Sequence, residues 1–214
     1  MIRTLTYTSG YPTALPGIRR RPLAFSPDLT VVYGPNGSGK TTIIRTLAHA
    51  AGLITDPLPF TYSIDRDAAP VVLFDPEDFV RSDLFLSRPE LRSSGEIQAG
   101  AINTFIDAIL SRFPLYRLSP HLRPTLLLDE PDHHVGFGAQ FILWRHILPA
   151  LARHFQVIVS SHSIFPVLLA KHTLLRDDLI IELHPGYTDY CIDALAEAVD
   201  FYNEQHTPPG DGPV

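Results

Sequence analysis

The chain has 214 residues, enough for one sizeable domain, and 45% of them are hydrophobic, so that a full core can form. The sequence contains no apolar run of about 18 residues, so that it predicts no membrane span. The N-terminus lacks the apolar stretch of a signal peptide. The single cysteine excludes an internal disulfide, and the net charge of −6 argues against a uniformly basic nucleic-acid-binding protein. We therefore expect a cytoplasmic protein.

Short apolar runs alternate with helical patterns along the chain, which predicts an α/β fold with a mostly parallel sheet. Residues 29–33 predict a strand that stops at Gly34, and residues 41–51 predict an amphipathic helix that stops at Gly52. We expect further helices at 98–113 and 139–154, the second kinked at Pro149, and further strands at 71–74, 125–128, 155–159 and, nearer the sheet edge, 178–183. One domain is expected over residues 1–202, followed by a Pro/Gly-rich tail without stable structure over 203–214.

The segment 34–41 (Gly-Pro-Asn-Gly-Ser-Gly-Lys-Thr) matches the phosphate-binding pattern G-x-x-x-x-G-K-[ST] in full. Its glycines allow a tight turn that points backbone N–H groups at phosphate oxygens, and the following helix adds the positive end of its dipole. Lys40 is expected to reach the β- and γ-phosphates of ATP, Thr41 to hold Mg²⁺, and Thr42 to donate toward the α-phosphate. The preceding strand and the following helix favour this interpretation over a purely structural turn. The predicted nucleotide-binding residues are Gly34, Pro35, Asn36, Gly37, Ser38, Gly39, Lys40, Thr41 and Thr42.

Two adjacent acids, Asp129 and Glu130, follow the apolar run 125–128. In a parallel sheet the carboxyl ends of the strands meet at one edge, where the phosphate-binding loop also lies. Because adjacent strand residues point to opposite faces, the two acids can serve different roles. Asp129 suits a Mg²⁺ shell, usually through water, and Glu130 suits a general base that polarises the attacking water. The alternative is that the two acids only decorate a strand end, and the phosphate-binding loop upstream makes the catalytic interpretation the stronger one.

Residues 34–42 together with Asp129-Glu130-Pro131 closely resemble the Walker A and Walker B motifs of the ATP-binding-cassette (ABC) superfamily. Residues 93–96 (Ser-Ser-Gly-Glu) resemble the signature motif of that family, although Ser93 and Glu96 also fit an ordinary helix capping box. His162, at the end of the apolar run that starts at 157, resembles the family's switch histidine, which contacts the γ-phosphate. The resemblance spans residues 25–165, and its four motifs follow the order that the family has.

This resemblance implies a P-loop NTPase fold whose mostly parallel central sheet is flanked by helices, with an ABC-type head and a much reduced helical subdomain. It also implies a homodimer that closes on two Mg-ATP molecules, in which Ser94 and Gly95 of one subunit cap the γ-phosphate bound to the other. The catalytic residues of such an ATPase would be Lys40, Glu130 and His162, and its Mg²⁺ ligands would be Thr41 and Asp129.

The chain departs from the family pattern at three points. No glutamine lies between Lys40 and the signature-like segment, so that the usual lid glutamine is missing, and Asp75 or Glu77 is the candidate to replace it. The stretch from 77 to 93 is too short for the helical subdomain of transporter subunits or for the long coiled coils of chromosome-structure ATPases. The aromatic side chain that would stack on adenine is not decided between Tyr7, Tyr11 and Phe25.

The resemblance favours a soluble, ATP-driven molecular switch similar to the small ATPases of DNA repair and phage defence, acting on an unknown protein partner. Nucleic acid remains an open candidate as a second partner. One alternative is the nucleotide-binding subunit of an ABC membrane transporter, which the short middle segment and the missing lid glutamine disfavour. A further alternative is an ATP sensor with little turnover, and Glu130 argues against it because a binding module needs no general base.

Overall fold

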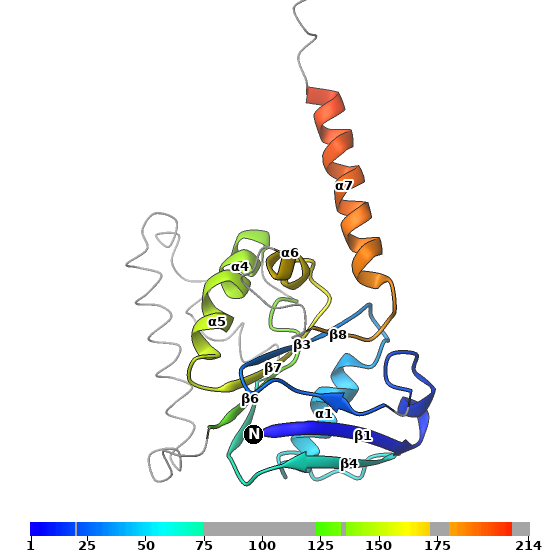
Figure 1. The fold of residues 1–214 in the computed structure, drawn as a ribbon, viewed down its shortest axis with the longest axis vertical. Coiled ribbons are helices and arrows are strands. Elements are labelled where there is room, and N and C mark those ends of the chain that lie inside the picture. The colour runs from blue at the N-terminus through cyan, green and yellow to red at the C-terminus, as the bar shows by residue number, and fades with distance from the viewer. Residues whose placement is uncertain (20, 75–122, 134–135, 172–179, 207–214) are drawn as a thin grey trace, which may run out of the picture.

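The computed structural model describes residues 1–19, 21–74, 123–133, 136–171 and 180–206, which form two sheets (Figure 1). The smaller sheet is antiparallel, and in it β1 (Ile2–Ser9) lies between β2 (Leu23–Ala24) and β4 (Thr61–Arg66). The larger sheet is parallel and has the strand order β5-β6-β7-β3-β8 among the described residues. Its strands are β3 (Leu29–Tyr33), β5 (Val71–Phe74), β6 (Thr125–Leu128), β7 (Gln156–Ser161) and β8 (Ile180–Glu182).

The parallel sheet is buried on both faces, which explains why its central strands are continuous apolar runs. On one face, Val32, Leu127 and Ile158 pack with α1 (Lys40–Ala50) and with β1 of the small sheet. The neighbouring strand residues point to the opposite face, where they join the core formed with the later helices. Helix α1 is therefore enclosed between the two sheets (Figure 1).

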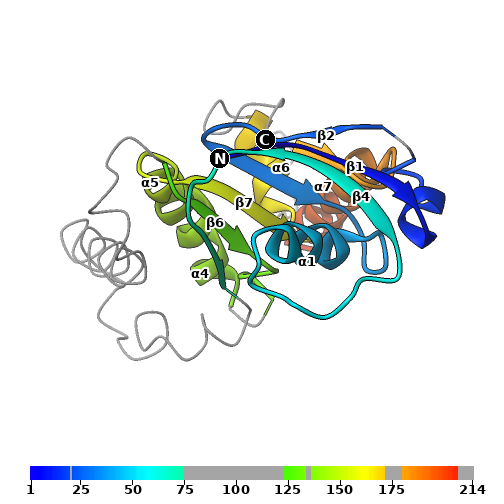
Figure 2. The ribbon, with the colours of Figure 1, turned by 90° about the horizontal axis from the view of Figure 1, so that it is seen from below.

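The opposite face is covered by helical segments that follow β6 and β7 (Figure 2). The chain forms α4 (Phe137–Ile142), a π-helical segment η4 (Leu143–Ile147) and α5 (Leu148–Leu151) before β7, and α6 (Phe165–Lys171) after it. A 3₁₀ helix, η1 (Tyr11–Ala14), follows β1, and the long α7 (Tyr187–His206) follows β8. Among the described residues, no helix is long and apolar enough to cross a lipid bilayer.

The strands and the first helix agree with the sequence prediction to within a few residues, and β8 is an edge strand as expected. The helix predicted over 139–154 is instead composite, and its hydrogen bonding changes from π to α at Leu148, next to Pro149. Proline has no N–H to donate, which is consistent with an irregular turn at this point.

The fold differs from the sequence prediction in two features, and two further segments of the prediction lie outside the described residues. The antiparallel sheet of β1, β2 and β4 was not predicted; in β1 the buried residues Leu5 and Tyr7 alternate, but Ile2 lies three positions before Leu5. Helix α7 continues through His206, so that residues 203–206 are helical rather than part of a tail. The predicted helix over 98–113 and residues 207–214 lie outside the described residues.

Candidate active site

The phosphate-binding loop connects the end of β3 to the start of α1. Gly37 and Gly39 have φ angles of 79° and 102°, in the left-handed region that side chains disfavour. A Cβ atom on Gly39 would also lie 2.6 Å from Leu15 Cδ1, so that the Leu15 side chain would have to move. Gly39 is the N-cap of α1, and no side chain caps that helix end. The first N–H groups of α1 are thus left for an anion.

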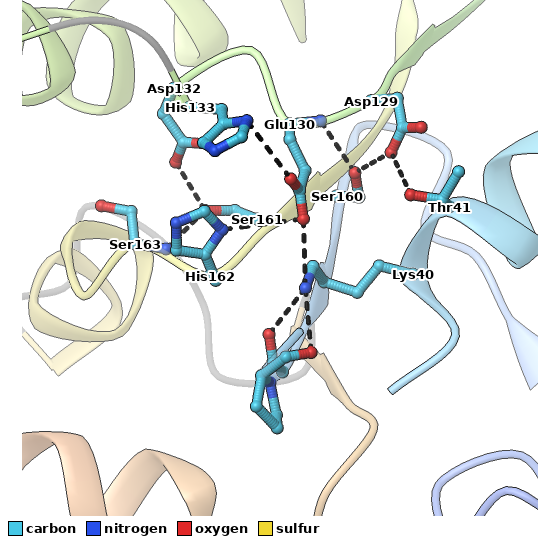
Figure 3. A network of polar contacts seen from close by, with 12 residues as sticks. Lys40, Thr41, Asp129, Glu130, Asp132, His133, Ser160, Ser161, His162 and Ser163 are labelled. Atoms are coloured by element: carbon cyan, nitrogen blue, oxygen red, sulfur yellow. Dashed lines mark hydrogen bonds and ion pairs between the residues drawn. The ribbon is translucent and has the colours of Figure 1, made fainter. Parts of the chain in front are cut away.

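Lys40 points back into this loop although it is only 4% exposed. Its Nζ donates to the carbonyl oxygens of Gly34 at 2.9 Å and Pro35 at 3.0 Å, and forms an ion pair with Glu130 Oε1 at 3.1 Å (Figure 3). Burying an ammonium group is costly unless it is paired, and these three oxygens provide the pairing. A phosphate group placed in the loop would compete with Glu130 for the same cation.

Asp129 lies directly after β6 and faces the start of α1. Its Oδ1 accepts hydrogen bonds from Ser160 Oγ at 2.6 Å and from Thr41 Oγ1 at 3.3 Å. Burial raises the pKa of Asp129, and the nearby charge of Glu130 adds to that rise, whereas the two hydroxyl groups and Lys40 act in the opposite direction. The hydroxyl of Thr41 and the carboxylate of Asp129 therefore form a pair of hard oxygen ligands.

Glu130 has a φ angle of 44°, the one positive value for a non-glycine residue in the described part of the chain. Its backbone N–H donates to Ser160 Oγ at 2.9 Å, which holds this unusual conformation. Both acids lie beyond the end of β6, so that strand alternation, the reason predicted from sequence, does not separate them. The left-handed backbone at Glu130 separates the two side chains instead. Asp129 points toward Thr41, and Glu130 points toward Lys40.

Two histidines flank the Glu130 carboxylate. His162 Nδ1 lies 3.6 Å from Oε1, His133 Nδ1 lies 3.9 Å from Oε2, and the two rings meet edge to face at 5.7 Å. Burial raises the pKa of Glu130, but the hydrogen bond and charge of Lys40, followed by the two histidines, outweigh it, so that the net pKa is lowered. Glu130 is consequently ionised near neutral pH, as a general base must be.

A second polar network lies behind these histidines and was not predicted from the sequence. Asp132 is 2% exposed, and its Oδ2 accepts hydrogen bonds from Trp144 Nε1 at 3.0 Å and from Ser161 Oγ at 2.5 Å. Ser163 N donates to Ser161 Oγ at 2.9 Å, so that the loop carrying His162 is fixed on both sides. Asp132 thereby links the loop after β6, the π-helical segment η4 and the loop after β7.

A pocket of about 480 Å³ opens beside the phosphate-binding loop. Its lining residues come from η1, the loop, the start of α1 and the segment after β6: Tyr11, Leu15, Asn36, Gly37, Gly39, Lys40, Thr41, Thr42, Glu130 and His133. Tyr11 is 52% exposed, and its hydroxyl lies 2.8 Å from Thr42 Oγ1. Tyr7 and Phe25 are buried in the core, so that of the three aromatic candidates only Tyr11 faces this pocket.

The structure thus brings together the side chains that the sequence placed in one site: Lys40, Thr41, Asp129, Glu130 and His162. Ser160, Asp132 and His133 were not predicted as site residues, whereas Tyr11 was one of the three aromatic candidates for adenine. Ser160 could have been found, because it stands two residues before His162 in a strand that must lie beside β6. The predicted residues Ser94 and Gly95, and the lid candidates Asp75 and Glu77, lie outside the described residues.

A family model for an AAA domain matches residues 17–63, which include the phosphate-binding loop and α1. The rest of the nucleotide-binding pattern lies outside this match. It consists of the strand order of the parallel sheet and the acids that follow β6, which accompany the loop that follows β3. The chain has the fold of a P-loop NTPase. In this fold β7 lies between β3 and β6, so that the loop, the two acids and His162 all project from adjacent strand ends.

Solved structures similar to this P-loop NTPase include ATP-binding cassettes of transporters. A protein from Pyrococcus furiosus, provisionally assigned as an ABC transporter ATP-binding protein, shares 17% identity, with 86% of this chain and 96% of that chain covered and a TM-score of 0.45. A nucleotide-free cassette from an ABC transporter shares 18% identity, with coverages of 78% and 84% and a TM-score of 0.41. CbiO1 from Clostridium perfringens shares 18% identity, with coverages of 77% and 80% and a TM-score of 0.37. No curated protein matches the chain.

The residues at the loop fit the Mg²⁺ ion that such NTPases use. Mg²⁺ prefers oxygen ligands and commonly takes only one or two from protein, with the rest from phosphate and water. Thr41 and Asp129 supply two such oxygens 3.3 Å apart. Among the described residues no group of three His, Cys, Asp or Glu side chains could hold a metal ion without such help. A buried Ser38 hydroxyl without a hydrogen-bond partner in the described structure also suits a phosphate oxygen.

Proposed function

We propose that this P-loop NTPase binds Mg-ATP in the pocket beside Gly34–Thr42 and hydrolyses it to ADP and phosphate. The observation that carries the proposal is the convergence of five side chains: Lys40, Thr41 and Glu130 line one pocket, and behind them Asp129 contacts Thr41 and His162 lies next to Glu130. These side chains provide a cation, a hydroxyl group, two carboxylates and an imidazole. Each of them matches one requirement of phosphoryl transfer.

In the proposed mechanism the triphosphate takes the place of Glu130 as the main partner of Lys40. The two groups are 3.1 Å apart in the protein alone, and phosphate oxygens in the loop would draw the Lys40 ammonium away. Glu130 would then be released to accept a proton from the attacking water. Glu130 enters this step ionised, because the pairing with Lys40 lowers its pKa before the nucleotide binds.

Thr41 and Asp129 would hold Mg²⁺, whose charge neutralises the phosphate oxygens. His162, 3.6 Å from Glu130 Oε1, would orient the carboxylate and contact the γ-phosphate. Tyr11 would pack against the adenine ring, because it is the aromatic residue that lines the pocket. We also propose that Ser94 and Gly95 of a second copy cap the γ-phosphate, so that ATP closes a homodimer whose opening and closing acts as a switch, in DNA repair or phage defence on the strength of the family resemblance.

The decisive test replaces Glu130 with Gln, which keeps shape and hydrogen-bonding capacity but removes the base. We expect ATP hydrolysis to fall by roughly 100-fold or more, while ATP binding persists and Mg-ATP traps a dimer in size exclusion with light scattering. Asp56→Asn, an exposed acid outside the site, is the matched control and should behave as wild type. A wild-type chain that binds ATP without turnover would make the protein a sensor, and equal turnover in Glu130→Gln would remove Glu130 from the mechanism.

A further inference from the structure

Helix α7 carries an unusual share of the exposed apolar surface. Its first turns pack on the main core through Tyr187 and Ile192, and residues 193–205 are exposed throughout. Figure 1 shows the rest of the helix projecting away from both sheets. Of the eight large hydrophobic residues exposed in the described structure, five belong to this helix: Tyr190, Leu195, Val199, Phe201 and Tyr202.

These side chains are arranged by helical periodicity. Residues three or four apart share a helix face, so that one compact face, which we call the α7 apolar face, consists of Ala194, Leu195, Ala198, Phe201 and Tyr202. A solvent-facing helix has no need of such a face. Ala194, Leu195, Ala198 and Phe201 are each exposed, so that no other element among the described residues covers this part of the face.

The charge on α7 is of one sign. A second stripe, which we call the acidic stripe, follows spacings of four, four, three and four: Asp189, Asp193, Glu197, Asp200 and Glu204. The helix contains no Lys or Arg. Like charges three or four residues apart destabilise an isolated helix, and Glu204 in the last turn faces the negative end of the helix dipole. A cation from outside the helix would relieve both.

The apolar face and the acidic stripe border each other. Glu197 and Glu204 each follow a residue of the apolar face, Ala194 and Phe201, by three positions, so that they lie along its flank. A hollow along this flank is lined by both kinds of residue: Ala194, Glu197, Ala198, Asp200, Phe201 and Glu204. An occupant of the apolar face therefore places its own flank against carboxylates.

From this arrangement we propose that α7 is the docking element for a partner protein that presents apolar side chains flanked by Lys or Arg. An antiparallel pairing with the α7 of a second copy fits poorly, because it would oppose Glu197 and Glu204 with the same acids. Nucleic acid and anionic membranes are excluded from this surface by the same carboxylates, since both carry negative charge.

The base of α7 is rigidly joined to the strand that precedes the phosphate-binding loop. The Tyr187 ring contacts that of Tyr33, the last residue of β3, at 5.3 Å, and Thr188 N donates to Glu182 Oε1 at 2.8 Å. A partner on α7 thus stands on an element in direct contact with the residue before Gly34. The docking itself is independent of ATP hydrolysis, so that it holds or fails apart from the proposed ATPase activity.

The test measures binding of two labelled 21-residue helical peptides to the full chain by fluorescence anisotropy, without nucleotide. Both peptides carry Leu at heptad positions a and d, and one has Lys and the other Glu at the remaining positions. We expect the Lys peptide to bind at least roughly tenfold more tightly than the Glu peptide. Glu197→Lys/Glu204→Lys should reverse this preference, and Leu195→Ser/Phe201→Ser should weaken binding of the Lys peptide by roughly tenfold.

The controls are Leu53→Ser and Asp56→Lys, an exposed apolar residue and an exposed acid that both lie outside α7, and neither should change either affinity. Circular dichroism checks that all variants remain folded. If Leu195→Ser/Phe201→Ser binds the Lys peptide as wild type does, only general counter-charge attraction is present and the proposal fails. It also fails if neither peptide binds, or if the chain alone dimerises in light scattering and Leu195→Ser/Phe201→Ser abolishes that dimer.

Discussion

Asp132 illustrates what a single buried acid contributes at the residue scale. Its carboxylate accepts hydrogen bonds from Trp144 and Ser161, while its second oxygen, Oδ1, has no hydrogen-bond partner in the described structure. Burial raises the pKa of Asp132, and the hydrogen bonds from Ser161 and Trp144 only partly offset that rise. The residue therefore holds the His162 loop in place at a cost in stability when it is ionised.

Because of this cost, we expect the contribution of residue 132 to stability to depend on pH when the residue is Asp and not when it is Asn. Because the folded pKa is raised, folding favours the protonated form, and the contribution of Asp132 to stability is complete below its ordinary value of 3.8 and is lost as pH rises through the higher folded value. Urea denaturation of wild type and Asp132→Asn over a pH series should show Asp132→Asn gaining relative stability above pH 3.8. A constant difference between the two proteins would contradict this, and comparing them cancels the titration of Asp129 and Glu130.

At the scale of elements, Gln156 joins the two sheets. It is fully buried at the start of β7, and its amide donates to the carbonyl oxygens of Ile2 at 2.6 Å and Ser26 at 2.9 Å. Its Oε1 accepts from Ile2 N at 2.7 Å and Thr125 Oγ1 at 2.9 Å. One side chain thus satisfies polar groups of β1, of the segment before β3 and of β6.

Removing this amide should be among the most damaging single changes in the described structure. Gln156→Leu fills a similar volume but leaves several buried polar groups unpaired, each costing about 1–3 kcal/mol. We expect the free energy of unfolding to fall by about 3–5 kcal/mol in chemical denaturation. Gln205→Leu, at an exposed position on α7, should change it by less than about 0.5 kcal/mol; an equal loss in both variants would show that Gln156 has no joining role.

For the whole molecule, the parallel sheet separates two cores, and the candidate site lies where its strands end. Alternate residues of β3, β6 and β7 enter one core or the other, so that the sheet and α1 form a rigid frame. The phosphate-binding loop with Lys40 and the segment after β6 with Glu130 extend from this frame, and the ion pair of these two residues joins them. Ligands that bridge these segments should stabilise the whole fold.

Nucleotide should therefore raise the thermal stability of the chain through Lys40. At a Mg-ATP concentration about 100 times Kd, binding contributes about 2.7 kcal/mol, which corresponds to a rise in Tm of roughly 5–10 °C for a domain of this size. Lys40→Ala should lose the shift, whereas Arg45→Ala, an exposed cation on the same helix, should keep it. Differential scanning fluorimetry measures both, and a full shift in Lys40→Ala would separate the loop from ATP binding.

The sequence by itself determined the features that depend on neighbours in the chain. The glycines and Lys40 of the loop, the apolar strands and the pair of acids after β6 form local patterns, and the structure has the corresponding elements at nearly the same residues. β1 and β4 were not predicted because their apolar residues alternate only weakly with polar ones. Their pairing also joins residues more than fifty positions apart.

Only the tertiary structure decided which side chains of the site contact one another. Thr41 and Asp129 meet across 88 positions of the chain, and that contact exists because only β7 separates β3 from β6 in the sheet. The ion pair of Lys40 with Glu130, the left-handed backbone of Glu130 and the choice of Tyr11 for the pocket follow from the same long-range packing. Local preference sets which residues form strands and turns, but the strand order of the folded sheet sets which side chains meet.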